Sequence, residues 1–100
     1  MTPIAQYLDQ IIALCHGNHV KELAVFGSVL TSKYSESSDI DLIVEFEQLE
    51  PHQYADCYFR LKFALEDLFH RPVDLLERKA LRNPFLLSEI ESKKQLLYAA

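Results

Sequence analysis

The sequence predicts a small α/β (α+β) domain, because helical and strand-like segments alternate along a chain of 100 residues. Several segments repeat apolar residues at helical spacing, and the short apolar runs between them have the length of buried strands. Hydrophobic residues make up 49% of the chain and charged residues 25%, which is an ordinary globular balance. A chain of this length supports one hydrophobic core, so we expect a single domain over residues 1–100.

The elements of the first half follow from start and stop signals. Thr2 can cap a helix and Pro3 fits its first turn, so a helix is predicted from there to Gly17, which can take the left-handed conformation. An apolar run then predicts a buried strand. The predicted segments are a strand over 22–26, a short helix or turn over 28–33 and a polar loop over 35–38.

The clearest strand covers residues 39–47, because side chains alternate between the two faces of a strand. Ile40, Leu42, Val44 and Phe46 share its apolar face, so the acidic residues of the segment share the other. The remaining elements are a long helix over 52–69, a strand over 73–77, a helix from 83 to about 93 and a closing strand over 96–98.

Charge and hydropathy exclude two classes of partner. The net charge is −5 and the basic residues are scattered, which argues against stable binding to nucleic acid. No stretch approaches the roughly 20 apolar residues that span a bilayer. Residues 1–6 lack the basic region and apolar run of a signal peptide, so we expect a cytoplasmic protein without a membrane anchor.

Candidate chemistry begins at Gly27-Ser28, where a predicted strand enters a turn or helix. Glycine lets the backbone approach a ligand, free N–H groups attract phosphate, and the Ser28 hydroxyl can add a hydrogen bond. Asp39 and Asp41 are two residues apart on a predicted strand, so both carboxylates face one site. Adjacent carboxylates repel each other, and a divalent cation such as Mg²⁺ removes that repulsion.

Asp74 lies on another predicted strand and could bring a third carboxylate to the same place. Three carboxylates can hold two metals for phosphoryl transfer, with Asp74 as general base. Taken singly, Gly-Ser is usually a turn, Asp-x-Asp a solvated strand face, and Asp74 a cap or a partner of Arg71. Gly-Ser followed at one fixed offset by Asp-x-Asp, however, arises by chance in roughly one such chain in a thousand.

Gly27-Ser28, ten intervening residues and Asp39-Ile40-Asp41 resemble the signature of the nucleotidyltransferase superfamily typified by DNA polymerase beta. The surrounding sequence resembles the minimal nucleotidyltransferase branch, which consists of stand-alone prokaryotic domains of about this length. The segments that carry this second resemblance are residues 24–28, 38–46, 71–76 and 96–98. The likeness therefore extends over nearly the whole chain.

The resemblance implies a small mixed β-sheet with helices packed on one face and the active site on the other. It implies ATP as donor, Mg²⁺ as cofactor, Asp39, Asp41 and Asp74 as metal-binding and catalytic carboxylates, and Gly27 and Ser28 as the triphosphate-binding turn. Many members of this branch are antitoxins paired with a HEPN-type ribonuclease toxin, and some silence the toxin by adenylylating it.

One segment departs from the family pattern, which commonly has Arg directly after Gly-Ser and a Gly shortly beyond. Here residues 29–32 are Val-Leu-Thr-Ser, so Lys33 is the nearest candidate cation for the triphosphate. We expect an enzyme that transfers AMP from ATP to a hydroxyl of its toxin and forms a hetero-oligomer with it. The alternative is a degenerate antitoxin that neutralises its partner by binding alone. A small-molecule enzyme of the aminoglycoside type is disfavoured, because 100 residues leave no acceptor domain.

Overall fold

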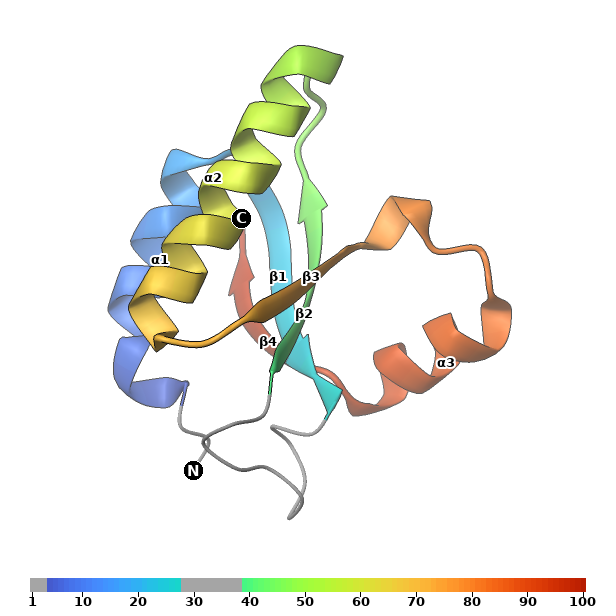
Figure 1. Cartoon of the computed structure of the whole chain (residues 1–100). Helices are drawn as coiled ribbons and strands as arrows, with labels where there is room; N and C mark the ends of the chain where they lie inside the picture. The colour runs from blue at the N-terminus through green and yellow to red at the C-terminus, as the bar shows by residue number, and fades with distance from the viewer. Residues whose placement is uncertain (1–3, 28–38) are drawn as a thin grey trace.

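A computed structural model describes residues 4–27 and 39–100 and builds them around a four-stranded sheet (Figure 1). The strands are β1 (Val20–Phe26), β2 (Ile40–Phe46), β3 (Val73–Glu77) and β4 (Gln95–Ala99), in the order β3-β2-β1-β4. β1 pairs antiparallel with both β2 and β4, whereas β2 pairs parallel with β3. The sheet is therefore mixed, as the family resemblance implied.

The helices lie on both sides of this sheet. α1 (Leu8–Gly17) and α2 (Pro51–Phe69) pack on one face, as the resemblance implied. α3 (Pro84–Lys93) lies on the other side (Figure 1), and its Ile90 packs against Ala24 and Ile43 there. The described part of the chain contains no helix with the length and apolar character that a membrane crossing requires.

α1 ends at Gly17, as predicted, but the conformation of its end differs from the prediction. Thr2 and Pro3, where the helix was expected to start, lie outside the described residues. A 3-10 turn, η1 (Ala5–Tyr7), precedes the helix, and Gly17 stays helical instead of taking the left-handed conformation. That conformation falls on His19, with φ 58°. The reason is Asn18, which is buried and donates its side-chain amide to the carbonyl of Leu14 at 2.9 Å, so an orphan carbonyl of the last turn is satisfied without a glycine cap. The predicted turn over 28–33 and loop over 35–38 lie outside the described residues.

The other element boundaries agree with the sequence to within two residues. Asn83 caps α3 by accepting hydrogen bonds from the N–H groups of Phe85 at 2.9 Å and Leu86 at 3.3 Å. Pro84 occupies the first turn, as its missing N–H allows. The strand predicted over 73–77 is β3, with the same bounds.

The alternation predicted for β2 is confirmed and separates the two faces of the sheet. Ile40, Leu42 and Val44 are buried against α1 and α2 in the main core. Asp41 and Glu45, on the opposite face, are half-buried. The main core also contains side chains of both helices: Ile11, Cys15, Cys57, Leu61, Leu65 and Phe69.

β3 is an edge strand, and α2 covers its outer edge with polar side chains. The N–H of Val73 donates to Oε2 of Glu66 at 3.0 Å. The hydroxyl of Tyr58 donates to the carbonyl of Leu75 at 2.5 Å. Unpaired edge groups are templates for unwanted strand pairing, so these bonds protect the edge as well as join helix to strand.

Candidate active site

The register of β2 and β3 places Asp41 and Asp74 side by side. They are direct partners in the parallel ladder, between the pairs Ile40 with Val73 and Leu42 with Leu75. Partners in a ladder point to the same face, and both aspartates lie on the face opposite the main core. The structure therefore brings together two of the three predicted carboxylates, from segments more than thirty residues apart in the sequence.

Gly27 makes room for one of these carboxylates. Phe26 is the β1 partner of Asp41, so Gly27 follows directly beside it. A Cβ atom on Gly27 would overlap Oδ2 of Asp41 and lie 3.1 Å from its Cγ. The φ angle of Gly27 is 77°, which side chains also disfavour. The sequence suggested a glycine that lets a ligand approach; here the close approach is made by the carboxylate of Asp41.

Asp39 holds a different position. It is exposed and precedes the strand, which begins at Ile40, so strand alternation does not direct its side chain toward Asp41. Within residues 4–27 and 39–100, no group of three His, Cys, Asp or Glu side chains is placed to hold a metal ion. The three-carboxylate site thus stays a prediction, of which the structure pairs Asp41 with Asp74. Ser28 and Lys33 lie outside the described residues.

The chemistry of this pair suits a hard divalent cation. Two carboxylates on adjacent strands repel each other unless a cation or a proton lies between them. Oxygen ligands from one or two carboxylates, completed by phosphate oxygens and water, are what Mg²⁺ takes in phosphoryl-transfer sites. Asp41 is half-buried and Asp74 is exposed, so one carboxylate is partly covered by the protein and the other is accessible to solvent. The residues present therefore fit a Mg²⁺ ion.

The negative charge of Asp74 acts on Tyr58 of α2. The pKa of Tyr58 is raised above its ordinary value, first by burial and then by the charges of Asp74 and Glu77. The phenol therefore stays protonated at neutral pH and acts as a hydrogen-bond donor.

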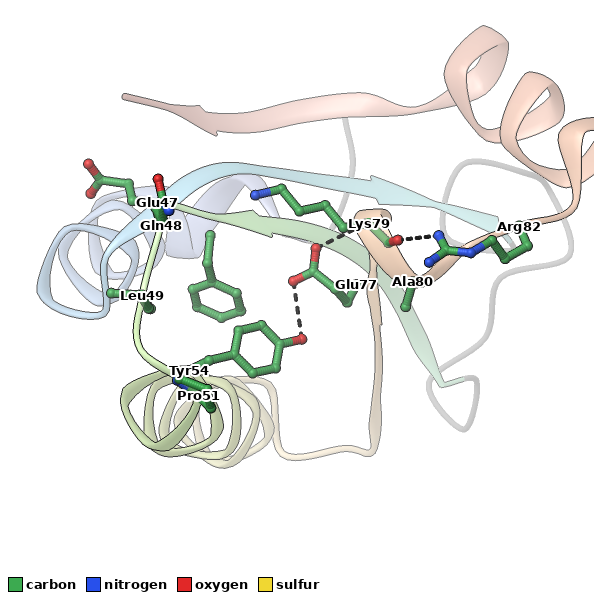
Figure 2. Close-up of a pocket in the computed structure, with 10 residues that line it drawn as sticks. Glu47, Gln48, Leu49, Pro51, Tyr54, Glu77, Lys79, Ala80 and Arg82 are labelled. Atoms are coloured by element: carbon green, nitrogen blue, oxygen red, sulfur yellow. Dashed lines mark hydrogen bonds between the residues drawn. The ribbon is translucent and has the colours of Figure 1, made fainter.

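A separate groove of about 530 Å³ lies at the opposite end of the β2–β3 pair (Figure 2). Tyr54 donates to Oε2 of Glu77 at 3.2 Å, and the other oxygen of Glu77 accepts the N–H of Lys79 at 3.0 Å. The groove is at the carboxyl ends of these strands, whereas Asp41 and Asp74 are at their amino ends, so it is not part of the carboxylate pair. Sequence reasoning missed it because its wall is assembled from β2, α2 and the 3-10 turn η3 (Arg78–Ala80).

Residues 8–97 match the family model described as "Nucleotidyltransferase domain". The match extends over most of the chain, and the fold and the carboxylate pair described above are consistent with it. The chain belongs to the nucleotidyltransferase family, and it is an enzyme of that class.

Individual relatives within this family are similar to the chain in sequence or in fold. The chain is 39% identical over 79 residues, 79% of its own length and 76% of the relative's, to "Putative protein adenylyltransferase MJ0128" of Methanocaldococcus jannaschii. A solved structure described as a putative minimal nucleotidyltransferase superposes with a TM-score of 0.77 at 29% identity, covering 92% of this chain and 90% of that one. A second solved structure is described as the tri-AMPylated HEPN toxin of Shewanella oneidensis in complex with MNT antitoxin. It superposes with a TM-score of 0.65 at 19% identity, covering 96% of this chain and 72% of that one, which shows that the fold is shared.

Proposed function

We propose that this chain is a Mg²⁺-dependent protein adenylyltransferase that moves AMP from ATP to a hydroxyl of a HEPN-type toxin and thereby acts as its antitoxin. The observation that carries the proposal is the ladder pairing of Asp41 with Asp74, beside a glycine whose missing side chain the Asp41 carboxylate requires. The relatives named as protein adenylyltransferases support protein as the acceptor class.

The carboxylates share the metal in this scheme, and Asp74 has a second task. Asp41, packed against Gly27, and its ladder partner Asp74 would hold the metal, and Asp39, the residue before β2, would join them. Mg²⁺ bound there supplies charge stabilisation for the phosphate oxygens. The backbone of Gly27 and the hydroxyl of Ser28 receive the triphosphate, with Lys33 as the nearest cation.

Transfer then follows from the position of Asp74. The acceptor hydroxyl oxygen forms a bond to the α-phosphorus of ATP, the bond from that phosphorus to the bridging oxygen breaks, and pyrophosphate leaves. The proton of the hydroxyl passes to the carboxylate of Asp74, which is exposed and therefore open to an acceptor that arrives from outside.

A partner protein is the expected source of that hydroxyl. The fold is shared with an MNT antitoxin in complex with an AMPylated HEPN toxin. A toxin docked over the open face would supply the nucleophile and could complete the phosphate site, as a trans-acting Arg does in other phosphoryl-transfer systems. We expect the pair to act in the cytoplasm.

The test incubates the purified chain with labelled ATP, Mg²⁺ and the toxin encoded by the neighbouring gene, and looks for AMP adducts by mass spectrometry. The Asp41→Asn variant is the matched control, because it keeps the size of the side chain and removes its charge. The proposal expects an adduct on the toxin with the native chain and none with the variant.

The second candidate is a degenerate antitoxin that acts by contact alone. It is favoured by residues 29 and 30, where Val and Leu stand in place of the usual Arg. This candidate expects the toxin to be neutralised without any adduct, and equally well by Asp39→Asn/Asp41→Asn. That result would overturn the enzymatic proposal.

A further inference from the structure

Two side chains of α2 hold the backbone of β3 on either side of Asp74. Glu66 accepts the N–H of Val73, the residue before Asp74, at 3.0 Å. Tyr58 donates to the carbonyl of Leu75, the residue after it, at 2.5 Å. The two bonds come from one helix, two turns apart, and they bracket a single residue of the strand.

The geometry of an edge strand explains why these groups are free for α2. In a parallel ladder the backbone groups of alternate residues point to opposite sides. Within residues 4–27 and 39–100, no strand lies beyond the outer groups of Val73 and Leu75, because β3 is at the edge of the sheet. Without Glu66 and Tyr58, the described hydrogen bonds of the β3 backbone would lie on one side only, in its ladder with β2.

We propose that Glu66 and Tyr58 are positioning residues, which set the carboxylate of Asp74 against that of Asp41 by clamping the backbone on both sides of Asp74. This inference rests on the proposed function, since it assigns the clamp to the carboxylate pair that serves transfer. Neither residue touches substrate in this scheme, because both bonds are made to the outer edge of β3, from the helix that covers the core face.

The clamp is itself held in place. The ring of Tyr58 stacks on Tyr54 with centroids 6.2 Å apart and meets Phe59 edge-on at 5.1 Å. Packed rings restrict the direction of the hydroxyl, and a donor with few alternatives loses little freedom when it binds the carbonyl of Leu75. Glu66 lies in the last turns of α2, whose end is closed by His70 in the left-handed conformation.

Loss of Glu66 or Tyr58 should change the metal affinity of the site more than it changes the fold. Partners that orient a ligand typically change metal affinity or activity by roughly 10–100-fold when they are removed. A residue that only stabilises the domain would leave the affinity of the folded molecules unchanged. The two roles therefore predict different results in the same variants.

The experiment compares Glu66→Ala and Tyr58→Phe with two controls in the full chain. Glu66→Gln keeps an acceptor oxygen for Val73, and Tyr54→Phe removes a phenol bond of the same helix to Glu77, beyond Asp74. Mn²⁺ binding is measured by electron paramagnetic resonance, and amide hydrogen exchange of Val73 and Asp74 is measured by NMR. Both readouts are made without ATP or toxin.

We expect the Mn²⁺ dissociation constant to rise about 10-fold or more in Glu66→Ala and Tyr58→Phe, with faster exchange at both amides, and to stay near native in the two controls. Native Mn²⁺ affinity and native exchange in folded Glu66→Ala and Tyr58→Phe would overturn the clamp. A chain that binds Mn²⁺ but never adenylylates the toxin would refute the proposed function and leave the clamp supported. If the native chain binds no Mn²⁺, exchange at Asp74 alone decides, and an unchanged rate in both variants rejects the clamp.

Discussion

The two faces of the sheet use the same strands for different purposes. On the face under α1 and α2, β2 contributes Ile40, Leu42 and Val44 to a core that contains most of the buried residues. On the other face the buried cluster contains only Ala24, Ile43 and Ile90 within the described part of the chain. Asp41 and Asp74 lie on this face but are not part of that small cluster; Asp41 is half-buried and Asp74 is exposed. Substitutions of neighbouring residues in β2 should therefore have different effects, on transfer for one face and on stability for the other.

The largest effect should come from Asp41→Asn, on the open face. We expect transfer of AMP to fall by about 1,000-fold or more, because several kcal/mol of charge stabilisation depend on the metal ligand. The melting temperature should stay the same or rise, since the repulsion between Asp41 and Asp74 is relieved. Transfer assays and thermal melts on the same samples measure both. Substantial residual transfer would remove Asp41 from the mechanism.

The next residue, on the buried face, should behave in the opposite way. Leu42 is 0% exposed, so Leu42→Ala should lower the free energy of unfolding by about 2–5 kcal/mol through lost burial and the cavity left behind. Transfer per folded molecule should be close to native. Urea denaturation gives the free energy, and active-site titration gives the folded fraction. A stable Leu42→Ala without activity would show that the two faces are not separable.

Gly27 should affect both stability and transfer, because its backbone follows the end of β1 and its missing side chain leaves space for Asp41. Gly27→Ala should cost about 1–2 kcal/mol of stability from its left-handed backbone and should also reduce transfer, since Asp41 must move. Gly17→Ala is the control: it is helical and a Cβ there meets nothing within 4 Å, so it should stabilise the chain by about 0.5–1 kcal/mol. Equal effects from both variants would contradict the assignment.

The smallest effect belongs to Tyr54, far from the carboxylate pair. Burial, followed by the charge and hydrogen bond of Glu77, raises the pKa of Tyr54 from 10.0 to about 12. A raised pKa favours the protonated phenol in the folded chain, so its stabilisation is complete below pH 10 and is lost as the pH rises toward 12. Urea midpoints measured between about pH 9 and 11.5 should therefore fall less steeply in Tyr54→Phe. Identical slopes would mean that the bond to Glu77 does not persist in solution.

Much of the fold could be predicted because the signals are local. The alternation of β2, the Asn83-Pro84 start of α3 and the bounds of β3 each depend on a few neighbouring residues. α1 ends at Gly17, as predicted, but without a left-handed glycine, because the side chain of Asn18 reaches the carbonyl of Leu14. The position of α3 on the open face could not be predicted, since it depends on Ile90 meeting Ile43 from a distant segment.

The site was predictable in its residue types and less so in its geometry. Strand alternation correctly places Asp41 away from the core, and the spacing of the family signature identifies Gly27. Register is a property of two strands together, so the sequence of either strand alone could not fix the direct pairing of Asp41 with Asp74. Asp39 shows the limit of the alternation argument, because the strand starts one residue after it. The bonds from Glu66 and Tyr58 leave no sequence signature at all.

β4 sets the order in which the sheet can be completed. It pairs with β1, joining Leu23 to Tyr98, and Lys94 reaches back to Glu22 at 3.0 Å. The segment from β1 to β3 contains both carboxylates and can pair over shorter connections. The contact between β1 and β4 must instead close the segment over residues 27–94, which carries a larger entropic cost. Refolding should therefore protect the amides of β2 and β3 before those of β4, so that the carboxylate pair is assembled while one edge of β1 is still unpaired.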